Sequence, residues 1–159
     1  MFIFALWNLF NNALIDNNMT LKLIAIIQPN GRADIHEYDV EEGWDDLPPM
    51  IDAKRLDAIR TQPLYDLSEK MGYFNKHITA WVDNIGLLRG LPENRIGCML
   101  YPGPIVGDLI LTLEDNKYNP MSFDDMDELK KILVELNANL VNVYLDDGPD
   151  DDGRFDAWS

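Results

Sequence analysis

The sequence predicts a small α+β domain, with a mostly antiparallel sheet and two or three helices packed on it. The chain has 159 residues, of which 47% are hydrophobic, and this is enough for a single core. Apolar runs of strand length are separated by turn residues. Strands and helices follow one another without the regular βαβ alternation of a parallel sheet, and no internal repeat is visible.

The first elements predict a β-hairpin. Residues 21–28, LKLIAIIQ, form a β-branched apolar run that stops at the turn signal Pro29-Asn30-Gly31. Residues 33–40, ADIHEYDV, then alternate between apolar and polar side chains. We therefore expect two antiparallel strands with one face in water.

The next part predicts short helices followed by a strand. Residues 41–49 are acidic and turn-like, and residues 50–59 have the apolar spacing of a short helix, at Ile51, Leu56 and Ile59. A further helical turn or two is indicated before Gly72, at Leu64, Leu67 and Met71. Residues 73–83 alternate as in a strand. One face carries Phe74, Ile78, Ala80 and Val82, and the other carries Tyr73, Asn75, His77, Thr79 and Trp81.

The last elements are a strand, a helix and an edge strand. Residues 105–113, IVGDLILTL, predict an apolar strand entered through the rigid turn Pro102-Gly103-Pro104. Ser122 is the predicted N-cap of a helix through Asn137, because acidic residues follow it at once and lysines come later, as the helix dipole favours. LVNVYL, at 140–145, predicts a final edge strand.

The two ends of the chain differ from the domain between them. Residues 1–18 are apolar but lack a basic leader and fall short of a roughly 20-residue span, so we expect neither a secretory signal nor a membrane helix. They are either a peripheral helix, using Phe2, Leu6, Leu9 and Ile15, or an extension read from a wrongly chosen start, and we expect them to be dispensable. Residues 19–145 form the domain, and residues 146–159 form a mobile acidic tail.

Charge restricts the kinds of partner. There are 28 acidic and 13 basic residues, which gives a net charge of −15. Such a chain is repelled by phosphate backbones and anionic membranes, so we expect no direct nucleic-acid partner and no membrane. The charge suits a basic protein surface, although it also serves solubility. Cys98 is the only cysteine, so no intramolecular disulfide is possible, and we expect a reducing, cytoplasmic setting.

No motif predicts catalysis. Cys98, His36 and His77 are too few for a zinc site, and the tail fails the calcium-loop pattern where Gly148 and Ser159 replace the required carboxylates. Nucleophile, phosphate-loop and dinucleotide motifs are also missing. We therefore assign no catalytic residue, metal ligand or cofactor, and enzymatic activity is unsupported.

The loop before the apolar strand has two interpretations. Arg89, Glu93, Asn94 and Arg95 are polar and close in sequence, as in a recognition loop. Alternatively the segment is a rigid connection in which Asn94 and Arg95 satisfy buried carbonyls, and we favour this structural interpretation.

Residues 80–115 resemble a family of small uncharacterised domains found on phages, plasmids and other mobile elements. The shared pattern falls on Trp81-Val82-Asp83, Gly86-Leu87-Leu88, Gly90-Leu91-Pro92, Asn94 and Ile105-Val106-Gly107-Asp108. The similarity covers about residues 21–133, and it departs from the family in residues 48–76. It implies a mobile-element origin and an intracellular setting, and it supplies no catalytic residues.

Three functional hypotheses follow. The first is a non-enzymatic protein that binds a basic surface of a host protein, including as a nucleic-acid mimic or inhibitor. Its binding residues are Glu37, Asp39, Glu41, Glu42, Asp45, Asp46, Asp124, Asp125, Asp127 and Glu128. The second is a small-molecule or nucleotide-binding domain whose pocket lies along residues 89–95, with Arg89 and Arg95 neutralising the ligand. The third is a structural or assembly subunit.

Overall fold

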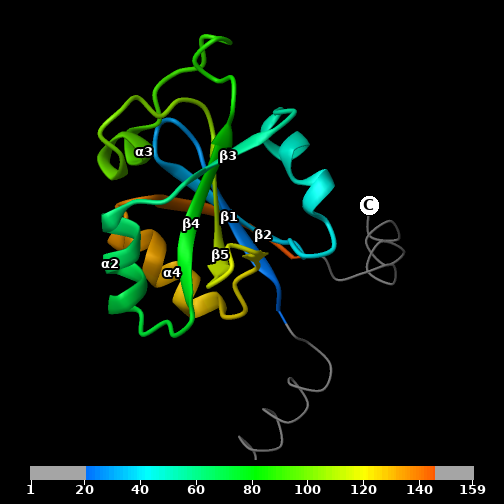
Figure 1. Cartoon of the computed structure of the whole chain (residues 1–159), viewed down its shortest axis with the longest axis vertical. Coiled ribbons are helices and arrows are strands. Elements are labelled where there is room, and N and C mark those ends of the chain that lie inside the picture. Colours follow the sequence, from blue (N-terminus) through cyan, green and yellow to red (C-terminus); the bar gives the residue numbers. More distant parts are fainter. Residues whose placement is uncertain (1–20, 146–159) are drawn as a thin grey trace, which may run out of the picture.

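The computed structural model describes residues 21–145, so the predictions for residues 1–18 and for the tail at 146–159 lie outside the described residues. The described chain forms one sheet with the strand order β3-β4-β5-β1-β2-β7, and β6 pairs with β5 (Figure 1). The strands are β1 (Leu23–Ile27), β2 (Arg32–Glu37), β3 (Leu56–Ile59), β4 (Lys76–Asp83), β5 (Leu109–Asp115), β6 (Pro120–Met121) and β7 (Asn139–Tyr144). The α-helices are α2 (Gln62–Lys70), α3 (Arg95–Leu100) and α4 (Met126–Glu135), and the 3₁₀ helices are η1 (Trp44–Asp46) and η2 (Pro48–Ile51).

The strand pairing confirms the predicted fold class. Every pair is antiparallel except β2 with the edge strand β7, which is parallel. The predicted hairpin is β1–β2, closed by a hydrogen bond from the Gly31 amide to the Gln28 carbonyl at 2.8 Å. Gly31 has φ +90°, a conformation that glycine adopts without strain.

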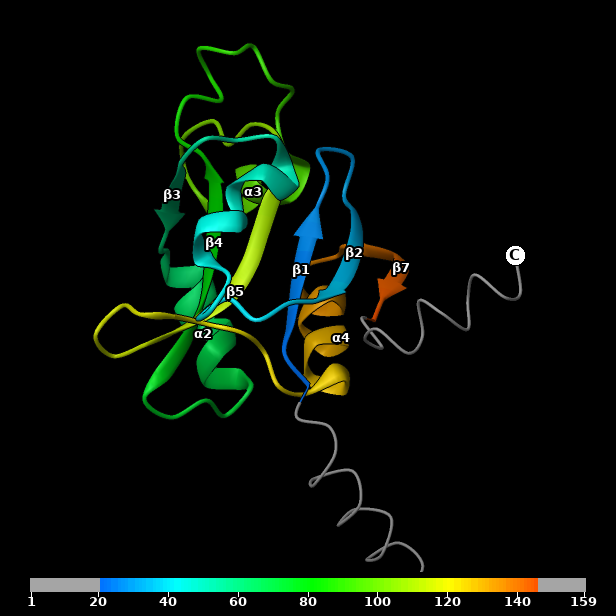
Figure 2. The same ribbon diagram turned by 90° about the vertical axis from the view of Figure 1, so that its right-hand side faces the viewer.

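The hairpin does not have the water-facing side that its alternation predicted. All five residues of β1 are buried. On one side of the sheet, Leu23, Ala25 and Ile27 pack with apolar residues of α2 and α4. On the other side, Ile24 and Ile26 pack under the segment from Val40 to Ala53, which carries η1 and η2. Figures 1 and 2 show the helices and this segment on opposite sides of the sheet.

The helix predicted over residues 50–59 is wrong. Pro48 and Pro49 start only the short η2, which ends at Asp52 with a left-handed φ of 57°. The chain then extends into β3, where Ile59 pairs with Ala80 of β4. The helix predicted before Gly72 is confirmed as α2. Alternation over residues 73–83 is confirmed within β4, whereas Phe74 precedes the strand and is 85% exposed.

Two later boundaries also differ from prediction. The apolar strand begins at Leu109 rather than at residue 105, because Gly107 has φ +78° and breaks the extended run. The N-cap of α4 is Asp125, whose carboxylate accepts the Glu128 amide at 3.1 Å. Ser122 instead makes tertiary hydrogen bonds to the chain after β2, accepting the Val40 amide at 2.9 Å and donating to the Tyr38 carbonyl at 2.6 Å.

Asn94 joins three parts of the fold and is fully buried. Its Nδ2 donates to the carbonyls of Ile27 at 3.0 Å and Gly107 at 2.9 Å. Its Oδ1 accepts the amides of Ile96 at 3.1 Å and Gly97 at 2.9 Å, which caps α3. One amide side chain therefore satisfies four backbone groups that would otherwise be buried without a hydrogen-bond partner.

We predict that Asn94→Ala lowers the free energy of unfolding by about 2–4 kcal/mol, because two buried carbonyls lose their donor and α3 loses its cap. Urea denaturation measures this loss. The matched control is Glu93→Ala, at an exposed neighbouring position, which we expect to change stability by less than about 0.5 kcal/mol. Equal stability of the two variants would contradict the structural role of Asn94.

Candidate functional site

Two of the three acidic stretches meet at one end of the sheet. The first follows β2, and the second begins α4. Ser122 bonds to the backbone of Tyr38 and Val40, and Leu23 and Phe123 form a β-bridge, with hydrogen bonds of 2.7 and 2.8 Å in the two directions. Residues that lie more than 80 positions apart in the sequence are therefore neighbours. In Figure 2 the start of β1 and the start of α4 lie at the same end of the molecule.

We call these carboxylates the acidic surface. It comprises Glu37, Asp39, Glu41, Glu42, Asp124, Asp125, Asp127 and Glu128. Glu41, Glu42, Asp124, Asp125 and Asp127 are exposed, and the other three are partly buried. Most carboxylates of the acidic surface are therefore accessible to a partner.

Two members of the acidic surface also hold the local backbone. Asp39 Oδ1 accepts the amides of Glu41 at 3.0 Å and Glu42 at 3.3 Å, which fixes the turn after β2. Asp125 caps α4. These hydrogen bonds hold the backbone that presents the exposed carboxylates, so the acidic surface is part of an ordered scaffold.

Among residues 21–145, few cations neutralise this surface. Lys22 Nζ lies 3.7 Å from Asp39 and 4.0 Å from Glu41, and its side chain is 40% exposed. No ion pair within residues 21–145 involves Asp124, Asp125 or Asp127. The negative field extends to the neighbouring Tyr73, whose pKa is raised, first by burial and then by Glu128 and the aspartates beside it. The acidic surface therefore keeps most of its charge.

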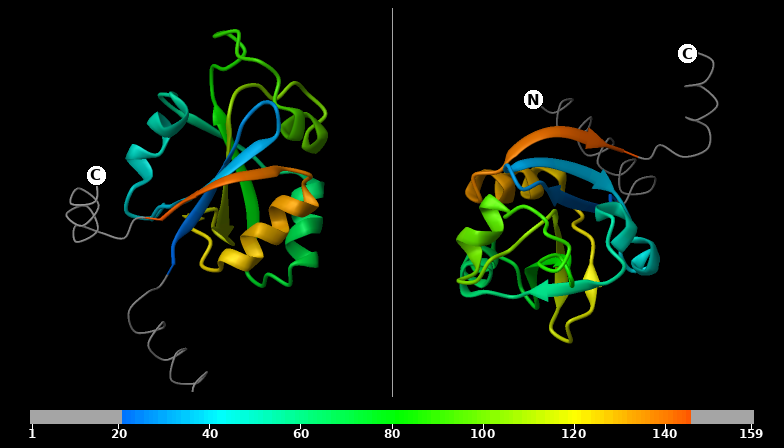
Figure 3. Two further views of the ribbon diagram at one scale, coloured as in Figure 1. Left: turned by 180° about the vertical axis from the view of Figure 1, so that it is seen from behind. Right: turned by 90° about the horizontal axis from the view of Figure 1, so that it is seen from above.

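The structure does not bring every predicted acidic residue to this surface. Asp45 and Asp46 lie on η1, in the segment that crosses to the side of the sheet opposite the helices. The same side is visible in Figure 3, where η1 and η2 lie away from α4. The aspartates of the tail lie outside the described residues.

The loop candidates are used within the fold rather than around a shared pocket. Arg89 bonds to Asp83 and to the Asp52 carbonyl and carboxylate, and Arg95 Nη2 donates to the Asn137 carbonyl at 3.0 Å. Asn94 is buried as described above, and Glu93 is exposed. A hollow of about 170 Å³ lies beside this loop, and none of the four residues lines it. Asn94 therefore satisfies buried carbonyls, as the structural interpretation expected, whereas the carbonyl that Arg95 contacts is exposed.

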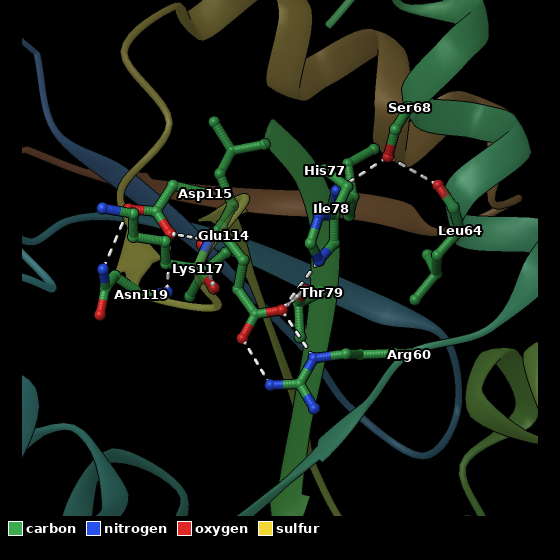
Figure 4. Close-up of polar contacts among 12 residues, drawn as sticks. Arg60, Leu64, Ser68, His77, Ile78, Thr79, Glu114, Asp115, Lys117 and Asn119 are labelled. Atoms are coloured by element: carbon green, nitrogen blue, oxygen red, sulfur yellow. Dashed lines mark hydrogen bonds and ion pairs between the residues drawn. The ribbon is translucent and has the colours of Figure 1, made fainter. Parts of the chain in front are cut away.

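A polar network on β4 and β5, completed by Arg60 directly after β3, was not predicted. Glu114 is fully buried and pairs in register with His77. Its Oε1 accepts hydrogen bonds from Arg60 Nε at 2.8 Å and Thr79 Oγ1 at 2.6 Å and contacts His77 Nε2 at 2.9 Å, while its Oε2 accepts from Arg60 Nη2 at 2.7 Å (Figure 4). The rings of Tyr65 and Tyr118 flank the network: Tyr65 lies 5.0 Å from the His77 ring, and Tyr118 lies 4.8 Å from the Arg60 guanidinium.

The network stabilises the ionised form of Glu114. Burial alone would raise the pKa of this carboxyl, but the hydrogen bonds from Arg60, Thr79 and His77 together outweigh burial and lower it. A carboxylate that is held ionised and fully hydrogen-bonded is a poor proton carrier at neutral pH. Its arrangement is that of a buried clamp joining three strands.

One sequence signal for this network was present. Thr112 and Glu114 alternate with Leu111 and Leu113 on β5, as His77 and Thr79 do with Ile78 on β4. Two polar positions at a spacing of two on each strand define a polar patch once the strands are paired. The pairing itself is long-range, so the sequence did not reveal that the two patches face each other.

The candidate metal ligands are separate. His36 stacks on Tyr144 with ring centroids 4.9 Å apart, and burial lowers its pKa despite the opposing effect of Asp34. Cys98 is partly buried on α3, and its thiol donates to the Ile105 carbonyl at 3.5 Å. Among residues 21–145, no three His, Cys, Asp or Glu side chains are grouped so that they could hold a metal ion.

Comparisons with protein-family models, with curated proteins and with solved structures find no match for this chain. No helix within residues 21–145 has the length and apolar character needed to cross a membrane.

We predict that Glu114→Gln lowers the free energy of unfolding at neutral pH by about 1–3 kcal/mol, because the charge of Arg60 loses its buried partner. The pKa of Glu114 is lower in the folded chain than in the unfolded one. Its stabilisation is therefore complete above the unfolded pKa of about 4.3 and is lost as the pH falls through the folded pKa. The variant should show a flatter loss of stability below about pH 4.3 than the parent chain.

Urea denaturation at a series of pH values measures both effects. The matched control is Glu69→Gln, which removes an exposed carboxylate on α2 outside the network. If Glu114→Gln and Glu69→Gln gave the same acid profile, the clamp would not contribute to stability.

Proposed function

We propose that this protein is a non-enzymatic binding protein whose acidic surface engages a basic surface of another protein. The observation that carries the proposal is the pair of hydrogen bonds at Ser122, because they place the two acidic stretches side by side. Separate stretches would give weak, scattered charge, whereas adjacent stretches give one patch of negative potential.

Contacts within the fold do not account for the concentration of charge on this patch. Asp39 and Asp125 cap backbone amides, but Asp124, Asp127 and Glu42 form no ion pair with a described residue. Like charges placed together lower stability, and solubility requires only that charge be present somewhere on the surface. Concentration of carboxylates at one end therefore supports a role in recognition.

The chemistry of the partner follows from the sign of the charge. Carboxylates repel phosphate backbones and attract lysine and arginine side chains, so the partner is a basic protein surface. Complementary charge speeds association and excludes acidic competitors. A basic surface that normally binds nucleic acid meets this description, and the acidic surface would then act as a competitor of that nucleic acid. We further propose that this basic surface belongs to a cytoplasmic protein of the host.

The ligand-binding alternative has less support. It requires Arg89 and Arg95 to neutralise an anion, but Arg89 is paired with Asp83 and Asp52. The side chain of Arg95 donates to the carbonyl of Asn137 across the molecule. The two guanidinium groups are therefore committed to different contacts.

We predict that the triple variant Glu41→Gln/Asp124→Asn/Asp127→Asn binds the partner about tenfold more weakly, since three exposed charge contacts contribute about 0.5 kcal/mol each. The matched control is Asp57→Asn/Asp66→Asn/Glu69→Gln, at exposed positions outside the acidic surface. Both variants remove three negative charges and change the net charge from −15 to −12.

Capture of proteins from a host lysate by each variant, quantified by mass spectrometry, measures this effect. A true partner is captured by the parent and the control, is depleted with the acidic-surface variant, and is released as salt rises. Competition by duplex DNA would identify the partner surface as a nucleic-acid site. A captured set that is the same for both triple variants, or that does not fall with salt, would overturn the proposal.

A further inference from the structure

A groove runs along the helix-covered side of the molecule. It consists of two adjoining hollows, of about 520 Å³ between α2 and α4 and of about 350 Å³ where these helices approach α3. Lys70 and Glu135 line both hollows and form an ion pair of 2.7 Å. In the left view of Figure 3, α2 and α4 lie next to each other on this side.

The two hollows differ in their lining. The hollow beside α3 is largely apolar, whereas the hollow between α2 and α4 is lined by Met71, Val134 and five charged residues, Lys70, Glu128, Lys130, Lys131 and Glu135. The hollow beside α3 is lined by the buried residues Leu67, Ile96, Leu100 and Leu136. On the rim of the groove, Val134 is 70% exposed and Met99 is 64% exposed. A concave strip of this kind between helices is the usual receptor for an amphipathic segment.

The described chain begins beside the start of α4. Leu21 packs against the helix-side core, to which Met71 and Met126 also contribute. Leu23 is bridged to Phe123, just before α4. Glu128, near the start of α4, lines the hollow between α2 and α4, as does Met71. The chain that precedes Leu21 therefore enters near this hollow.

The preceding residues have the composition that the groove would bind. Residues 1–10, MFIFALWNLF, are apolar except for Asn8, and Asp16 is the only charged side chain in residues 1–18. Residues 1–10 would therefore bring no charged side chain of their own into the groove. Phe2, Leu6 and Leu9 have helical spacing in the sequence. A helix of 18 residues would span about 27 Å, which exceeds the roughly 15 Å of the ten-residue α4.

We propose that residues 1–18 dock in the groove between α2 and α4, with Phe2, Leu6 and Leu9 against Val134 and the apolar residues beside it. The occupant is a segment of the same chain. The inference is independent of the acidic surface, and it replaces the expectation that these residues are dispensable. Burial of large apolar side chains would stabilise the domain and remove an exposed apolar segment from water.

A double-variant cycle in the full chain tests this proposal. We expect Val134→Asp to lower the melting temperature by several degrees, and Leu6→Asp/Leu9→Asp to lower it similarly. Because both changes disrupt one contact, their combination should lower it little further than either alone. Leu88→Asp is the control, since Leu88 is 88% exposed away from the groove, and its effect should be small and additive with the Leu6→Asp/Leu9→Asp change.

The proposal would be overturned if Val134→Asp left the melting temperature unchanged. It would also be overturned if the effects of Val134→Asp and Leu6→Asp/Leu9→Asp on the melting temperature were fully additive. Cross-linking gives a second measurement. A photo-reactive amino acid at position 134 should attach to a peptide from residues 1–18 at the mass of one chain. Attachment to the tail residues Phe155 or Trp158, attachment to a second copy, or no attachment to residues 1–18 would each overturn it.

Discussion

The side chains of β1 are excluded from water on both sides of the sheet, since Leu23, Ala25 and Ile27 lie under the helices and Ile24 and Ile26 lie under the segment that carries η1 and η2. Each side of this strand needs a cover, because apolar area left in water costs about 25 cal/mol per Å². After β2 the chain therefore crosses from the sheet to the side opposite the helices. Ser122 bonds to the backbone at that crossing and ties it to the start of α4.

The acidic surface follows from this crossing. Residues between Glu37 and Glu42 run past the edge of the two cores, where an ionised carboxylate can keep its water. The first turn of α4 also favours carboxylates, because the amide end of a helix carries partial positive charge. The constraint that builds the core thus places two acid-rich segments together. Each segment is favourable at its own position. The charges of the two segments together give one end of the molecule a strong negative potential.

The sequence predicted elements whose signals are local. The turn at Pro29–Gly31 defined the hairpin, and the amphipathic spacing before Gly72 defined α2. Prediction from the sequence failed where contacts between distant residues determine the structure. β3 has only four residues, and its strand character comes from pairing with β4. Ser122 has the sequence context of an N-cap but bonds to the chain after β2, and Glu114 acquires its partners only when β4 and β5 are in register. The acidic residues were predicted as binding candidates, but their grouping required the tertiary structure.

The central claim is that the acidic stretches after β2 and at α4 act as one surface. Titration of the ¹⁵N-labelled protein with an octalysine peptide tests it directly, because a small cation reports where the negative potential is greatest. The account predicts that amide signals of residues 37–42 and 122–128 shift together, with a single apparent affinity that falls as salt rises. Shifts confined to one of the two stretches, or equally large shifts at the exposed acids Asp57, Asp66 and Glu69, would contradict it.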